Sequence, residues 1–173
     1  MNILSLTETK TQFTATSVKP VPDFADYYGI STSQPLSQAI QIAVDGIEDG
    51  ELCPLGAGAE HSLEQSRAIL ALLVNCYVNE IYGSTDVASL MEGAPGFSCR
   101  WWETLPDGHA LRRFRSDNVR AIQHCLEEAL RFRREQKIRS GFVTKVNGAQ
   151  PAEEARRKIT MAAFADSMEL DGF

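Results

Sequence analysis

The chain has 173 residues, 43% of them hydrophobic, which suits one compact domain with a buried core and excludes global disorder. Its net charge of −6 and its pI near 5.1 exclude a protein coated in basic surface. The charge is uneven, because residues 1–99 hold 3 Lys/Arg against 12 Asp/Glu, whereas residues 100–139 hold 10 against 6. Such asymmetry indicates either an anionic partner near the basic part or two halves of one domain that attract each other.

The chain begins with a polar segment and then turns helical. Residues 1–34 predict an extended N-terminal arm, in which the alternating, Thr-rich run 11–19 favours an edge strand. Residues 35–139 predict a helical domain. Its first helix covers 36–47, where apolar residues recur at helical spacing and Pro35 stands in the first turn.

The clearest helix of the chain is expected over residues 63–81. It is apolar nearly all round, which predicts a central, buried helix that ends at Gly83. A short helix over 85–93 follows directly. A long helix, a tight Gly-Ser link and a short helix together indicate a corner of the kind that helix-turn-helix units use.

The basic part of the chain is expected to be helical as well. Residues 93–108 indicate a loop, and Asp107 is suited to cap a helix over 108–117. Apolar residues at core spacing continue the helical pattern over 119–138.

The last segment, residues 140–173, predicts a linker followed by an amphipathic C-terminal helix over 151–168. A short strand over 141–146 is the only further strand that the pattern favours. We therefore expect a mainly α fold, a compact multi-helix domain around a central buried helix. It would hold at most a small strand pair from 11–19 and 141–146.

The chain carries no pattern typical of an enzyme. It lacks a phosphate-binding glycine loop, G-x-S-x-G and H-E-x-x-H, and no nucleophile–base arrangement can be read around its three histidines. Its four cysteines lie more than twenty residues apart and form no C-x-x-C pair. We predict no catalytic residues, no cofactor and no metal site, with a hydrolase of unrecognised site as a minority alternative.

The sequence also favours one cellular location. Residues 1–19 lack the apolar core of a signal peptide, and the longest apolar run, 68–78, is too short to span a bilayer. We predict a cytoplasmic protein that has reduced thiols and does not interact with membranes.

Two basic clusters are the candidate binding residues. Arg112 and Arg115 lie three apart and share a face of the expected helix over 108–117, with Arg113 beside them and Leu111 and Phe114 turned inward. Guanidinium groups match phosphate oxygens, and a helix N-terminus adds backbone donors. The second cluster lies downstream and comprises Arg131, Arg133, Arg134, Lys137 and Arg139.

Three stretches, taken in order, resemble a known family. They are ILALLVNCYVNEIYGSTDVASLMEG (69–93), FSCRWWETLPD (97–107) and LRRFRSDN (111–118). Their order and spacing resemble the N-terminal helical domain of DDE-type insertion-sequence transposases, over about 65 residues of this chain. The resemblance implies a targeting or assembly domain without the catalytic domain. It also implies DNA contact, mainly to phosphates, through Arg112, Arg113 and Arg115. We predict that Arg120, Arg131 and Arg134 belong to the same DNA-binding face.

Two functions therefore follow as hypotheses. The first is a non-catalytic, transposase-like protein that binds DNA through a basic helical face. The alternative is a helical protein–protein interaction or oligomerisation module with no nucleic-acid binding, whose arginines pair with the acidic first half. In that alternative Phe97, Trp101 and Trp102 form a contact patch, and the partner is a second copy of the chain or a transposase catalytic subunit.

Overall fold

The computed structural model describes residues 34–55, 61–93, 105–142 and 149–170. Within these ranges the chain forms six α-helices and no strand, so the expected mainly α fold is confirmed. The arm over 1–33, the run 11–19, most of 141–146, and Trp101 and Trp102 lie outside the described residues.

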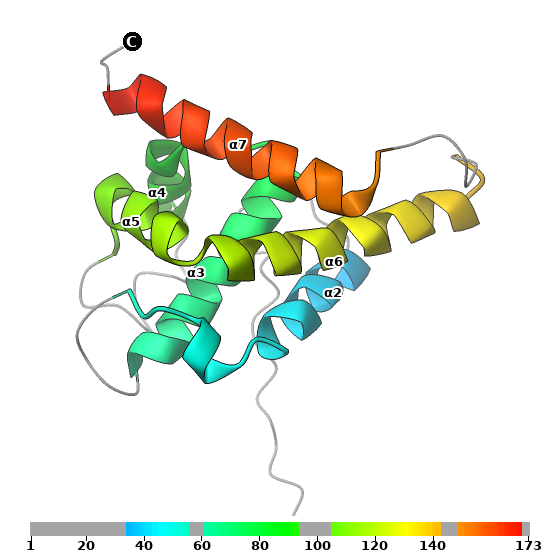
Figure 1. Cartoon of the computed structure of the whole chain (residues 1–173), viewed down its shortest axis with the longest axis horizontal. Helices are drawn as coiled ribbons and strands as arrows, with labels where there is room; N and C mark the ends of the chain where they lie inside the picture. Colours follow the sequence, from blue (N-terminus) through cyan, green and yellow to red (C-terminus); the bar gives the residue numbers. More distant parts are fainter. Residues whose placement is uncertain (1–33, 56–60, 94–104, 143–148, 171–173) are drawn as a thin grey trace, which may run out of the picture.

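The helices pack as one compact group (Figure 1). The described helices are, in chain order, α2 (Gln34–Asp45), a 3₁₀ turn (Asp49–Glu51), α3 (His61–Val78), α4 (Ser84–Gly93), α5 (Gly108–Asp117), α6 (Val119–Arg139) and α7 (Pro151–Leu170). Helix α6 packs against α2, α3 and α7. Helix α4 packs against α5, and α7 also contacts α3 and α4.

Helix α3 is the centre of the core, as its all-round apolar pattern predicts. Every residue from Ile69 to Val78 is buried. Its neighbours contribute large side chains from α2 and α6 and small ones from α7, where Ala155 and Ala162 let that helix approach closely. The C-terminal helix therefore shares the core of the residues before it. The division of the chain at residue 140 stays a prediction.

The end of α3 differs from the expected one. The helix stops at Val78 and not at residue 81, because Glu80 takes a left-handed backbone with φ 66°. The Glu80 amide then donates to Tyr77 O at 3.2 Å, and the Ile81 amide donates to Cys76 O at 2.9 Å. This pair of bonds is the Schellman motif, which usually has glycine at the left-handed position. The sequence does not indicate this motif, because glutamate stands at the position where glycine is usual.

Asn118 holds the junction of α5 and α6 against the loop before α3. Its side chain is buried, accepts from the Cys53 amide at 2.7 Å and donates to Cys53 O at 3.0 Å. It also donates to Phe114 O at 2.9 Å, which satisfies a carbonyl near the end of α5. One amide side chain thus joins three segments of the chain.

We expect Asn118→Ala to lower the free energy of unfolding by about 1–3 kcal/mol, because the partly buried hydrogen bonds from the Asn118 side chain to the Cys53 amide and carbonyl are lost. Urea denaturation measures this change. The control is His124→Ala, an exposed position on α6, which we expect to stay within about 0.5 kcal/mol of the wild type. Equal stability of both variants would contradict the role given to Asn118.

Candidate functional site

Helix α5 carries the arginine motif and is fixed at both ends. Asp107 accepts a hydrogen bond from the Ala110 amide at 2.8 Å, which confirms the expected N-cap. Leu111 and Phe114 are buried, as predicted, and anchor one side of the helix in the core. The arginines are therefore held on a rigid element.

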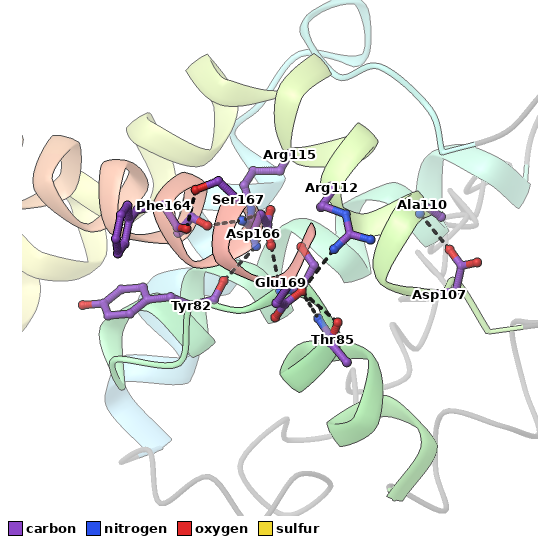
Figure 2. Close-up of polar contacts among 12 residues, drawn as sticks. Tyr82, Thr85, Asp107, Ala110, Arg112, Arg115, Phe164, Asp166, Ser167 and Glu169 are labelled. Atoms are coloured by element: carbon purple, nitrogen blue, oxygen red, sulfur yellow. Dashed lines mark hydrogen bonds and ion pairs between the residues drawn. The ribbon is translucent and has the colours of Figure 1, made fainter. Parts of the chain in front are cut away.

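Arg115 is an internal residue, with only 4% of its surface exposed. Its guanidinium forms a salt bridge with Asp166 of α7. It also donates to Ala162 O at 2.8 Å and to Tyr82 O at 2.9 Å, and it lies over the Tyr77 ring at 5.4 Å from the centroid. Figure 2 shows the polar contacts of Arg115 with Asp166 of α7 and with Tyr82 in the turn before α4. One side chain thus binds three parts of the fold.

The carboxylates of α7 also bind the start of α4. Asp166 accepts from the Ser84 amide at 3.0 Å. Glu169, three residues further along the same face of α7, accepts from the Thr85 hydroxyl at 2.8 Å, from the Thr85 amide at 3.4 Å and from Arg112 at 3.1 Å. Negative charge at a helix N-terminus is favourable, because unpaired amides and the helix dipole meet there.

This arrangement has the parts of an anion site, with guanidinium groups beside a helix N-terminus. The anions in it are the protein's own Asp166 and Glu169. Arg112 and Arg115 do share a face, as the sequence predicts, but that face turns toward α7 and not toward solvent. The interaction-module alternative paired the arginines with the acidic first half of the chain. This is wrong for Arg112 and Arg115, whose carboxylate partners lie in α7.

The remaining predicted binding residues do not gather into one cluster. Arg113 is turned outward, with 82% of its side chain exposed and Asp117 at 3.8 Å. Arg120 is exposed at the start of α6, and Arg131 forms ion pairs with Glu127 and Glu128 of its own helix. Arg134 donates to Ala149 O at 3.4 Å. DNA contact by these residues stays a prediction.

Two further arginines bind the ends of helices. Arg67 donates to Val44 O in the last turn of α2 and to Ile47 O just beyond it, each at 2.6 Å. Arg133 donates at 2.8 Å to Val78 O, the last residue of α3. The carbonyls at a helix C-terminus lack partners within the helix, so these arginines supply donors that the fold needs.

The outward face of α7 carries a feature that the sequence reading missed. Met161, Phe164 and Met168 are 46%, 58% and 39% exposed, and they recur at spacings of three and four, so they share one face. Figure 2 shows the Phe164 ring turned away from the arginines. The amphipathic pattern of α7 was visible in the sequence. It could not show that the small residues Ala155 and Ala162 face the core while the large ones face solvent.

An open groove of about 600 Å³ lies beside this face. Ala165 lines it, and Ala165 is four residues from Met161 and three from Met168, so the groove and the exposed face adjoin. The other lining residues include apolar and acidic side chains from the turn before α4 and from α4 itself, among them Ile81, Tyr82, Leu90, Glu80 and Asp86.

A buried lysine supports the wall of the groove. The side chain of Lys158 is only 2% exposed, and its amine lies 5.7 Å from the centroid of the Tyr82 ring and 3.4 Å from its hydroxyl. Glu80 supplies the opposite charge at 3.9 Å. Tyr82 and Glu80 are therefore tied to α7 through one amine.

The two buried cysteines of the core have thiols with raised pKa values. Burial raises the pKa of Cys76 and of Cys125 to about 12, although the positive charges of Arg115 and Arg67 respectively oppose the shift. Burial likewise raises the pKa of Tyr77. Because the thiolate is the nucleophile and the metal ligand, these cysteines are unreactive at neutral pH.

Two further observations concern the described ranges. No group of three His, Cys, Asp or Glu side chains there is placed to hold a metal ion. None of the helices in the described part of the chain has the length and apolar character needed to cross a bilayer.

We expect Asp166→Leu to lower the free energy of unfolding by about 3–5 kcal/mol, because it leaves the buried Arg115 guanidinium without a counter-charge. Arg115→Leu should have a similar effect. The double variant should lose less than the sum of the two by more than about 1 kcal/mol, because neither charge is then left alone. Urea denaturation of all three measures this, with Arg113→Ala as the exposed control on the same helix. Strict additivity would contradict the pairing.

We expect the free energy of unfolding to fall as the pH rises from about 9 toward 12. The pKa values of Cys76 and Cys125 rise from 9.0 to about 12 on folding, so above pH 9 the unfolded chain releases protons that the folded protein retains. Urea denaturation at several pH values measures the slope. Cys76→Ala/Cys125→Ala should flatten it, whereas Cys53→Ala, at an exposed position, should not. An unchanged slope in the double variant would contradict the assignment.

No protein family model, no curated protein and no solved structure matches this chain. The resemblance to DDE-type transposases therefore rests on the three stretches quoted above and stays a prediction. The proposals that follow rest on the geometry of the described residues.

Proposed function

We propose that this chain is a helical protein–protein interaction module, whose contact surface is the outward face of α7 together with the adjoining groove. The observation that carries the proposal is the row Met161, Phe164 and Met168, exposed on one face of a rigid helix. Single exposed apolar residues are common on proteins, but a row of large ones beside a groove is typical of an interaction site.

The residue types support this use. Aromatic residues and methionine are enriched at protein interfaces, whereas lysine and glutamate are depleted. Burying the exposed Phe164 ring against a partner would remove a large apolar area from water. The groove supplies carboxylates at Glu80 and Asp86, which give the surface a polar rim.

The arrangement of Arg112 and Arg115 supports the same proposal. Both guanidinium groups already have carboxylate partners within the fold, at Glu169 and Asp166. A phosphate would have to displace those carboxylates from a site that also binds the start of α4. The two residues therefore contribute to stability in the interaction-module hypothesis.

DNA binding by a transposase-like protein is the second candidate. The exposed positions of Arg113 and Arg120 favour it, because both can reach a phosphate without disturbing the core. Two such contacts predict weak binding whose log–log salt slope is about −2.

We expect a photo-crosslinking residue at position 164 to form a discrete covalent adduct with another polypeptide in cells that produce the protein. The same residue at position 131, exposed on α6, should form none. Gel mobility and peptide mass spectrometry of the adduct identify its components. Equal labelling at both positions, or no adduct at position 164, would contradict the interaction surface.

The same protein serves to test the second candidate. Fluorescence anisotropy with duplex DNA at several salt concentrations should show no binding if the chain is an interaction module. Salt-dependent binding that Arg113→Ala/Arg120→Ala abolishes, with the fold retained, would instead favour DNA binding.

A further inference from the structure

We propose that the partner of this surface is a second copy of the chain, with the two α7 helices packed antiparallel about a twofold axis. The inference rests on the proposed function, because it assigns an occupant to the same face of α7. Three features of the described residues carry it: the spacing of the row, the side chains that flank it, and the position of charge at its two ends.

The row has the spacing of a two-helix seam. Arg157, Met161, Phe164 and Met168 follow each other at intervals of four, three and four residues. Alternating intervals of three and four repeat every seven residues, the period at which one helix packs along another. Together with Arg157, the row extends over about 16 Å of helix at about 1.5 Å per residue.

The residues that flank the row permit close approach. Ala165 is small, and Thr160 and Ser167 on the other side are short and uncharged. The hydroxyl of Thr160 donates to Arg156 O at 3.0 Å, and that of Ser167 donates to Phe164 O at 2.7 Å. Since both hydroxyls already bond to their own helix, covering them leaves no donor unpaired.

The charges at the two ends of the row select the antiparallel arrangement. Arg157, an exposed residue, lies at the N-terminal end. Asp86 lies near the C-terminal end of the row, close to Glu169. A Cβ atom placed on Gly83 would touch the carboxylates of both residues, which shows that the two carboxylates lie near each other. Arg157 and Glu169 are twelve residues apart, so the level of residue 163 along the helix axis lies halfway between them.

A twofold axis at residue 163 therefore brings Arg157 to the level of the partner's Asp86, and the same contact forms a second time by symmetry. A parallel pair would instead place Arg157 beside the partner's Arg157. Self-complementarity of this kind is what a twofold interface requires, because each contact must occur in both directions. The contact area is small, so we expect a weak dimer with a dissociation constant in roughly the micromolar range.

Sedimentation equilibrium of the full chain over a range of concentrations tests the inference. We expect the wild-type mass to rise from 19.1 kDa toward twice that value. Phe164→Asp should stay at 19.1 kDa throughout, with unchanged helix content and melting temperature. The matched control is Phe142→Asp, which removes a phenylalanine that is 84% exposed but lies outside α7, and it should dimerise like the wild type.

A charge exchange tests the arrangement itself. Arg157→Asp alone and Asp86→Arg alone each place like charges together, so we expect each to weaken the dimer at least tenfold. Mixing the two variants restores both attractive contacts, so the mixture should dimerise nearly as the wild type does. Should circular dichroism show that Asp86→Arg has lost helix, Asp86→Asn takes its place and should also weaken the wild-type dimer.

Three results would overturn the inference: a wild-type chain that is monomeric at all concentrations, a Phe164→Asp variant that dimerises normally, or a mixture no tighter than its components. A monomeric chain that still forms an adduct at position 164 with a different protein would overturn only the dimer and leave the interaction surface in place. Absence of any adduct together with a monomeric chain would overturn both proposals.

Discussion

The buried salt bridge between Arg115 and Asp166 is the constraint on which the arrangement of α4, α5 and α7 depends. Removing two charges from water is costly, and the cost is offset only where the geometry supplies further hydrogen bonds. Here Ala162 O and Tyr82 O accept further hydrogen bonds from the guanidinium, and the Ser84 amide donates to the second oxygen of the Asp166 carboxylate. The pair therefore specifies where α7 lies along the other helices, because a shift of one turn would separate all of these groups.

Other arginine side chains also form hydrogen bonds within the fold. Arg67 and Arg133 bind the carbonyls at the ends of α2 and α3. A basic segment in an acidic protein suggests an external anion, and for several of these arginines the partner is internal. The exposed face of α7 instead offers large apolar side chains to a partner.

Much of the secondary structure could be predicted, because it follows from local chemistry. The periodicity of 36–47, 119–138 and 151–168 and the cap at Asp107 depend on residues that lie close together in sequence, and the helices appear there. The end of α3 could not be predicted, because a glutamate stands at the left-handed position that glycine normally marks.

The candidate site was harder to predict than the fold. The sequence indicated that Arg112 and Arg115 share a face, but their partners lie 57 and 51 residues away. Which face of α7 is buried depends likewise on how closely a neighbouring helix approaches. Helical spacing groups residues by face, and only the packing of the whole chain decides which face meets water.

The bonds from α7 to α4 have a consequence for the order in which the protein folds. Thr85 and Glu169 are 84 residues apart, and Ser84 and Asp166 are 82 apart. Contacts this distant in sequence form late, since a long loop must close before they yield any stabilisation. During synthesis, the first amides of α4 and the guanidinium of Arg115 have no carboxylate partner until α7 has left the ribosome. The packing of α4 and α5 against α7 therefore cannot be completed before α7 has been translated.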